Sequence, residues 1–160
     1  MVRRIWQWSQ ESQLGTVIED LVHVWYPPCV VLFEGPLGSG KTTMIRELFH
    51  HLGVLQSVKS PTFNLVHSYA LGRYRLVHAD LYRLDDRRDV ESLDLPSPDE
   101  VDTMLVVEWG QSLSEAYPER FDATIEVLEG GSRLLKVHAF GTMAEARLGS
   151  MPGTDPETSE

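Results

Sequence analysis

The sequence predicts a three-layer α/β fold, in which helices flank a mixed, mostly parallel central sheet. Two short apolar runs without alternation, at residues 29–33 and 104–107, are typical of strands buried on both faces in a parallel sheet. A glycine-rich loop and a helical segment follow the first run directly. Pairs of alternating segments later in the chain indicate antiparallel hairpins, which make the sheet mixed.

The elements before the first buried strand follow from periodicity. Residues 4–8 alternate apolar and polar side chains and predict an edge strand. Residues 10–25 predict a helix, because apolar side chains recur every three or four positions, and Ser9 is the expected N-cap. Pro27 and Pro28 end this element.

The remaining elements are bounded by turn residues. Residues 41–52 predict a helix that Gly53 ends. Two hairpins are expected, one from residues 65–70 and 74–79, the other from 121–128 and 133–140. Short helical segments are expected at 90–95 and 142–148. The single domain therefore covers residues 1–148, and residues 149–160, with few apolar side chains, predict a disordered tail.

Composition narrows the function classes. A chain of 160 residues with 42% hydrophobic and 24% charged residues is a folded domain, and its net charge of -10 argues against strong direct nucleic-acid binding. Two basic groups remain, Arg73 with Arg75 and a group at residues 83–88, and we expect solvation or pairing with nearby aspartates.

The cysteine content and the lack of targeting segments indicate the cellular compartment. The single cysteine, Cys29, allows no internal disulfide and opens an apolar run, so a buried, inert side chain is expected. No apolar stretch reaches membrane-spanning length, and the N-terminus does not resemble a signal peptide. These features predict a cytoplasmic protein with no membrane association.

The segment from Gly35 to Thr42 (Gly-Pro-Leu-Gly-Ser-Gly-Lys-Thr) is the Walker A pattern, placed between a strand and a helix as a phosphate loop requires. The backbone of Leu37, Gly38, Ser39 and Gly40 is expected to point N–H groups at phosphate oxygens. Lys41 would neutralise the β- and γ-phosphates, Thr42 would ligate Mg²⁺, and Thr43 would reach the α-phosphate. The sequence therefore predicts a P-loop NTPase fold that binds ATP with Mg²⁺.

An acid at the end of a neighbouring strand usually completes such a metal site. Glu108 follows the purer apolar run, and Asp80 follows a less uniform run that ends His78-Ala79. We assign Glu108 to the metal, and Asp80 either to the surroundings of the metal or to positioning the attacking water. The reverse assignment of the two acids stays open, as does a surface ion pair for either acid.

Two neighbouring features have more than one interpretation. The segment 60–63 (Ser-Pro-Thr-Phe) is either a switch that senses the γ-phosphate or a proline turn. Trp109 either stacks on the adenine or fills the core. The six histidines show no spacing typical of a zinc site.

Four motifs in order, residues 35–43, 59–63, 78–84 (His-Ala-Asp-Leu-Tyr-Arg-Leu) and 107–109 (Val-Glu-Trp), resemble the bacterial TsaE (YjeE-like) ATPases. The similarity runs from about residue 8 to about residue 148. The resemblance implies an ATPase, weak when alone, that acts with TsaB and TsaD to make the threonylcarbamoyladenosine modification of tRNA. Contact with tRNA would then be indirect, through the complex.

The resemblance also implies site residues. Together, Lys41, Thr42, Asp80 and Glu108 correspond to the family's phosphate, metal and catalytic positions, and Trp109 corresponds to a tryptophan near the nucleotide. Segment 60–62 corresponds to the family's switch.

The adenine side of the site is where the chain departs from the family. Glu11 stands where the family often has a threonine near the base or ribose, and Arg133 is a further candidate for nucleotide contact.

Two other functions remain open from the residues alone. A small-molecule kinase could use the same phosphate loop, with arginines of residues 80–88 as a lid, although the chain is short for an acceptor domain. A nucleotide-dependent protein switch is the second, but the Asn-Lys pair of a guanine-reading motif is absent from the chain.

Overall fold

A computed structural model describes residues 2–59, 65–82, 84 and 87–152 of the chain. The described residues form a seven-stranded sheet with the strand order β1-β7-β6-β2-β5-β4-β3. The strands are β1 (Val2–Trp8), β2 (Cys29–Glu34), β3 (Val66–Leu71), β4 (Tyr74–Asp80), β5 (Thr103–Glu108), β6 (Arg120–Val127) and β7 (Arg133–Phe140). The helices are α1 (Leu14–Leu21), α2 (Lys41–Leu52), α3 (Arg87–Glu91) and α4 (Thr142–Gly149), with 3₁₀ turns η1 (Glu11–Gln13), η2 (Gln111–Leu113) and η3 (Glu129–Gly131).

The direction of the strands confirms the predicted mixed sheet. The neighbouring strands β6, β2, β5 and β4 are parallel to one another. Strands β7 and β3 run antiparallel to β6 and β4, and each forms one arm of a predicted hairpin. Strand β1 pairs antiparallel with β7 and so points the same way as the parallel group. Most strands therefore share one direction.

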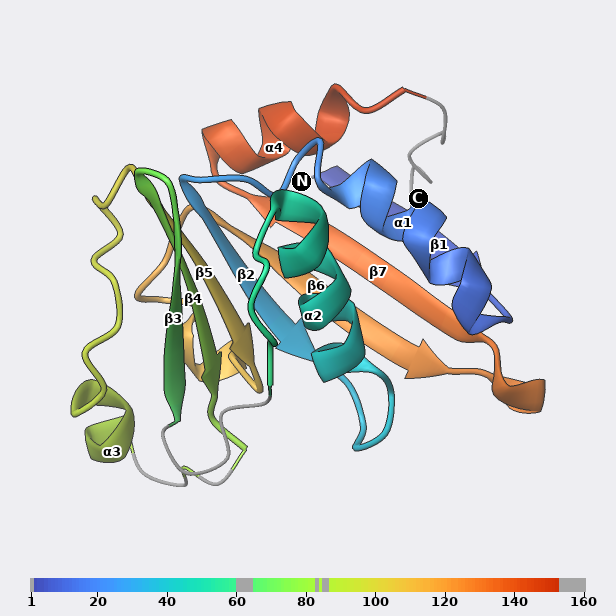
Figure 1. The fold of residues 1–160 in the computed structure, drawn as a ribbon, viewed down its shortest axis with the longest axis horizontal. Helices are drawn as coiled ribbons and strands as arrows, with labels where there is room; N and C mark the ends of the chain where they lie inside the picture. The colour runs from blue at the N-terminus through green and yellow to red at the C-terminus, as the bar shows by residue number, and fades with distance from the viewer. Residues whose placement is uncertain (1, 60–64, 83, 85–86, 153–160) are drawn as a thin grey trace.

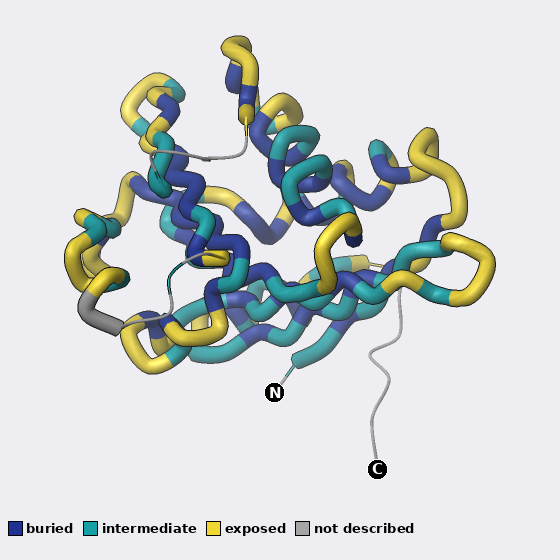
Figure 2. The backbone as a smooth tube through the Cα atoms, turned by 90° about the horizontal axis from the view of Figure 1, so that it is seen from below, coloured by how far each residue is buried: buried dark blue, intermediate teal, exposed yellow. Residues whose placement is uncertain are grey.

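The two faces of the sheet are covered unequally. Helices α1, α2 and α4 lie on one face (Figure 1), and the larger hydrophobic core lies between them and the sheet. Its fully buried side chains include Phe33, Ile45 and Phe49. The smaller core, on the other face, is closed by η2 and by the chain around α3. Figure 2 shows the buried segments concentrated between the sheet and the helices above it.

The alternation of side chains along β2 explains why this strand is apolar throughout. Val31 and Phe33 face the larger core, whereas Leu32 faces the smaller one. A strand with a core on each face has no solvent side for a polar residue. This central position places the end of β2, and the loop after it, in the middle of one edge of the sheet.

The predicted helix at 10–25 is wrong at both ends. The chain forms η1 and then α1, which ends at Leu21 and continues as turns. Ser9 does not cap the helix. Instead the Gln13 side chain accepts hydrogen bonds from the backbone N–H groups of Ser9 (2.9 Å) and Gln10 (3.0 Å), which closes the first turn. Beyond Leu21 the chain turns so that Trp25 packs edge-on against Phe33 in the core.

The short helix predicted at 90–95 begins and ends earlier, as α3. Pro96 explains only why Leu95 is not helical, because a residue before proline avoids the helical conformation. At the C-terminus the chain stays attached to the core as far as Met151, whose carbonyl oxygen accepts a hydrogen bond from Arg4 (2.9 Å). The rest of the predicted tail, from residue 153, lies outside the described residues.

Within the part of the chain that the structure describes, no helix is both long enough and apolar enough to cross a bilayer.

Candidate nucleotide site

The parallel strands bring the predicted site residues together. Register pairs Phe33 of β2 with Glu108 of β5, and Glu108 with Asp80 of β4. The three strands therefore end at the same edge of the sheet, where ligands of open α/β sheets bind. The predicted phosphate loop leaves β2 at this edge and enters α2 at Lys41.

The loop conformation depends on two glycines. Gly40, immediately before α2, has φ of 101°, a left-handed conformation that side chains disfavour. Gly35 lies so close to β6 that a Cβ atom would stand 2.6 Å from the carbonyl oxygen of Ile125 and 2.9 Å from Ser39 Oγ. The loop can therefore pack against β6 only with glycine at position 35.

Lys41 is buried, with 5% of its surface exposed. Its ammonium group donates hydrogen bonds to the carbonyl oxygens of Gly35 and Pro36 and lies 4.2 Å from the centre of the Trp109 ring. Burial lowers the pKa of Lys41 from its ordinary value, and the nearby carboxylates of Glu108, Glu34 and Asp80 offset this only in part. The buried Lys41 ammonium therefore lies where a further anionic group would offset the cost of its burial.

Thr42 and Glu108, the two residues predicted to hold the metal, contact each other. The Thr42 hydroxyl donates to Glu108 Oε1 at 2.7 Å, and Glu108 is 3% exposed. Among the described residues, no three His, Cys, Asp or Glu side chains cluster to hold a metal by themselves. Hydroxyl and carboxylate oxygens beside a phosphate loop fit Mg²⁺, which takes few protein ligands and completes its shell with water and phosphate. The residues present therefore fit this cation.

Asp80 lies beside the pair but is held differently. Its Oδ1 accepts a hydrogen bond from the backbone N–H of Tyr82 at 3.0 Å. Burial raises the pKa of the Asp80 carboxyl group; Glu108 also raises it, while the Tyr82 N–H, His78 and Lys41 lower it. Thr42 thus contacts Glu108, and the assignment of Glu108 to the metal and Asp80 to its surroundings stays a prediction.

Trp109 both packs on the smaller core and faces the site. Its backbone has φ of 58°, the single non-glycine residue with positive φ among the described residues. Its ring stacks at a tilt on Tyr82, with centroids 5.1 Å apart, and packs against the smaller core. The ring therefore fills part of the core and also covers Lys41, while stacking on the adenine stays a prediction.

Two adjoining cavities lie along the loop. One, of about 340 Å³, is lined by the whole phosphate loop from Leu37 to Thr43 and by the acids and aromatic rings described above. The other, of about 350 Å³, lies on the opposite side of Gly38–Gly40 and is lined by Trp8, Leu14, Glu11, Thr43 and Arg133. The structure thus places every predicted nucleotide contact in one of two cavities that share the loop as a common wall.

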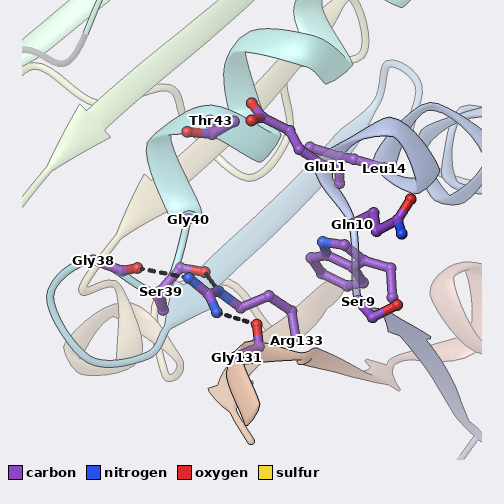
Figure 3. A pocket seen from close by; sticks show the side chains of 11 residues that line it. Ser9, Gln10, Glu11, Leu14, Gly38, Ser39, Gly40, Thr43, Gly131 and Arg133 are labelled. Atoms are coloured by element: carbon purple, nitrogen blue, oxygen red, sulfur yellow. Dashed lines mark hydrogen bonds between the residues drawn. The ribbon is translucent and has the colours of Figure 1, made fainter.

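Glu11 and Arg133 line the second cavity (Figure 3), whose lining does not include Asp80 or Glu108. Arg133 donates to the carbonyl oxygens of Ser39 (3.0 Å), Gly38 (3.4 Å) and Gly131 (2.7 Å). Its guanidinium group therefore ties the β6–β7 turn to the phosphate loop. The Glu11 carboxylate points toward Thr43 at the start of α2 (Figure 3). Direct contact of either side chain with a nucleotide stays a prediction.

The predicted switch segment at residues 60–63 lies outside the described residues, as does Arg83. The other basic group is paired: Arg75 lies 2.9 Å from Glu100, and Arg73 donates to the hydroxyl of Tyr74 at 2.7 Å.

Comparison with known proteins decides the family. The model of the family described as "Threonylcarbamoyl adenosine biosynthesis protein TsaE" matches residues 8–135, most of the chain. The chain belongs to the TsaE family.

TsaE relatives share much of their length with this chain. The TsaE protein of Nostoc sp. is 37% identical over 119 residues, which is 69% of this chain and 70% of that protein. The TsaE protein of Bacillus subtilis is 33% identical over 120 residues, 74% of this chain and 75% of that protein. The crystal structure of Bacillus subtilis YdiB superposes with a TM-score of 0.77 at 24% identity, over 94% of this chain and 95% of that one. This likeness supports the P-loop NTPase-like fold.

Sequence reasoning missed two residues of this TsaE-family site. Trp8 was taken only as part of an edge strand, yet it lines the second cavity. His78 was read as an irregularity in an apolar run, yet its Nε2 lies 2.8 Å from Glu108 Oε2. A signal for His78 was present, because it stands two residues before Asp80 and strand alternation puts both on one face.

Proposed function

We propose that this chain binds ATP with Mg²⁺, hydrolyses it, and supplies this activity to the TsaB–TsaD pair in tRNA threonylcarbamoyladenosine synthesis. The observation that carries the proposal is the contact between Thr42 at the end of the phosphate loop and Glu108 at the end of β5. It joins a phosphate-binding loop to a metal-binding acid, which are the two parts that phosphoryl transfer from a nucleoside triphosphate requires.

The two cavities suit the two halves of the nucleotide. The cavity beside Lys41, Thr42 and Glu108 would take the β- and γ-phosphates. The cavity beside Trp8 and Glu11 would take the nucleoside, with an indole and a carboxylate available for stacking and for hydrogen bonds from ribose or base. Each has the volume of a small-ligand site.

The residues suggest how hydrolysis proceeds. On binding, Lys41 exchanges its carbonyl partners for phosphate oxygens, which relieves the cost of its burial. Thr42 and Glu108 would hold Mg²⁺, which supplies charge neutralisation of the phosphates. Asp80 is placed to orient the water that attacks the γ-phosphorus, giving ADP and inorganic phosphate.

A partner-dependent role agrees with the charge of the chain. The net charge is -10, and Arg75 is already paired with Glu100. Such a surface favours protein partners over direct contact with tRNA. TsaB and TsaD are the partners that the family resemblance implies, and a cytoplasmic location belongs to the same proposal.

The test is ATP hydrolysis by the purified chain alone and with TsaB and TsaD from the same organism. We expect a low rate that rises in the mixture and is lost in Glu108→Ala. A chain that binds ATP well, but whose hydrolysis the mixture leaves unchanged, would contradict the partner-driven role. Faster transfer of phosphate to a metabolite than to water would identify a kinase instead.

A further inference from the structure

A histidine with no assigned role lies beneath the acid at the end of β5. His78 is fully buried on β4, and its Nε2 is 2.8 Å from Glu108 Oε2. Register explains the contact. Strands β4 and β5 are parallel with His78 opposite Val106 and Asp80 opposite Glu108. His78, Asp80 and Glu108 therefore lie on the α2 face of the sheet, and His78 reaches diagonally to Glu108.

The direction of this hydrogen bond follows from the chemistry of the two groups. An ionised carboxylate has no hydrogen to give, so Nε2 of His78 donates to Oε2 of Glu108. The other ring nitrogen, Nδ1, is buried with no hydrogen-bond partner among the described residues. Among the described residues, the polar contact of the His78 ring is therefore the one between Nε2 and Glu108.

The carboxylate of Glu108 is thus held at both oxygens. Oε1 receives the Thr42 hydroxyl at 2.7 Å and Oε2 receives His78. The Phe49 ring of α2 stands edge-on to the imidazole, with centroids 6.3 Å apart, and limits its movement from the helix side. Because Glu108 is nearly fully buried, removing the His78 donor would leave Oε2 without this partner and free the carboxylate to rotate.

We propose that His78 is a positioning residue, which orients Glu108 so that Oε1 faces Thr42 and the metal site. This inference rests on the proposed ATPase function for its consequence, but its geometry can be tested without it. Partners that orient a metal-binding side chain in this way typically affect metal affinity or activity about 10–100-fold. A histidine that only fills space would have no such effect.

The first measurement needs no nucleotide. Nitrogen-15 NMR of the imidazole in the full chain should show His78 protonated at Nε2, with a proton protected from exchange with solvent. Protection should fall in Glu108→Ala. A bare Nε2 with a protonated Nδ1 would overturn the proposal, because His78 could then not donate to Glu108.

The second measurement compares three substitutions. His78→Gln keeps an N–H donor at about the reach of Nε2, whereas His78→Leu fills the space without a donor and His78→Asn places its amide nearer Nδ1. We expect His78→Leu and His78→Asn to lose most of the tightening that Mg²⁺ gives to binding of a non-hydrolysable ATP analogue. We also expect at least about 10-fold slower hydrolysis in both variants, while His78→Gln stays within about 3-fold of the original chain.

Binding of ADP in EDTA serves as the internal reference, since phosphate-loop contacts remain. His138→Leu is the matched control, because His138 lies on β7 opposite Asp122, far from the site in the sheet order. Equal losses in His78→Gln and His78→Leu, or no loss in His78→Leu, would overturn the positioning role. If the original chain shows no hydrolysis at all, the proposed function fails, while the NMR and Mg²⁺-binding comparisons still decide the role of His78.

Discussion

Replacing Lys41 with methionine separates two effects of this cation, its contribution to ATP affinity and its destabilisation of the folded protein. Lys41 has a folded pKa below its ordinary 10.5, with burial as the largest cause. The folded protein therefore releases this proton at a lower pH than the unfolded chain, so at neutral pH the ammonium opposes folding. Methionine keeps an unbranched side chain of nearly the same length without the charge, and so loses the ammonium contact with Trp109. We therefore expect the midpoint of thermal unfolding, Tm, of the ligand-free variant to equal or exceed that of the original chain.

The nucleotide-bound protein should behave in the opposite way. A hydrogen bond to a charged group contributes about 1.5–3 kcal/mol, so the Kd for ATP should rise about 12–160-fold. At an ATP concentration 100 times the original Kd, binding stabilises the original chain by about 2.7 kcal/mol, but the variant by only about 0.3–1.3 kcal/mol. For a chain of this size these energies correspond to Tm increases of about 5–11 °C and about 1–5 °C.

Thermal unfolding followed by circular dichroism, with and without Mg²⁺ and a non-hydrolysable ATP analogue, measures both effects. Lys136→Met is the matched control, because Lys136 pairs with Glu126 on the β6–β7 hairpin outside both cavities. We expect its ligand-induced shift to be unchanged. An undiminished shift in Lys41→Met would refute the phosphate-binding role, and a ligand-free Tm several degrees lower would refute the reasoning on burial.

Three further predictions concern other parts of the site. Gly35→Ala should lower the free energy of unfolding in urea by roughly 1–3 kcal/mol, because its Cβ would meet the Ile125 carbonyl at 2.6 Å; an unchanged midpoint would contradict this. Arg133→Lys keeps the charge but loses the two-pronged contact of the guanidinium group with the loop carbonyls. Calorimetry should therefore show ATP affinity reduced about 2–10-fold, as in Arg133→Gln. Full affinity in the lysine variant would instead indicate a purely electrostatic role. Asp80→Asn should raise the free energy of unfolding of the ligand-free chain at neutral pH, because the folded pKa of Asp80 lies above 3.8 and its ionised carboxylate opposes folding. This gain in stability should vanish as pH falls toward 3.8. A gain in stability that grows in acid would count against the prediction.

What could be predicted from sequence depended on how local each signal was. The phosphate loop is contiguous, and its glycines have direct conformational reasons, so its placement between β2 and α2 followed at once. Asp80 and Glu108 are distant in sequence, yet their convergence was predictable, because the carboxyl ends of parallel strands share one edge.

Features that depend on tertiary packing could not be predicted from sequence patterns. The end of α1 is set by how Trp25 enters the core, which periodicity does not reveal. The Arg133 contacts with the loop depend on where the β6–β7 turn lies relative to Gly38. The contact between His78 and Glu108 could not be predicted from sequence, because it depends on the register between β4 and β5.

The polar groups of the site are paired with one another. The buried Lys41 ammonium contacts loop carbonyls and the Trp109 ring, and the Thr42 hydroxyl donates to Glu108. The pKa values of Lys41 and Asp80 are both shifted by burial in the direction that disfavours their charged forms. Burial of such groups lowers the folding stability when no ligand is bound. Bound phosphates and Mg²⁺ would act as charged partners for these side chains and stabilise the fold. Lys41 and Asp80, whose burial opposes folding, are therefore among the residues expected to make the chain selective for a metal-bound triphosphate.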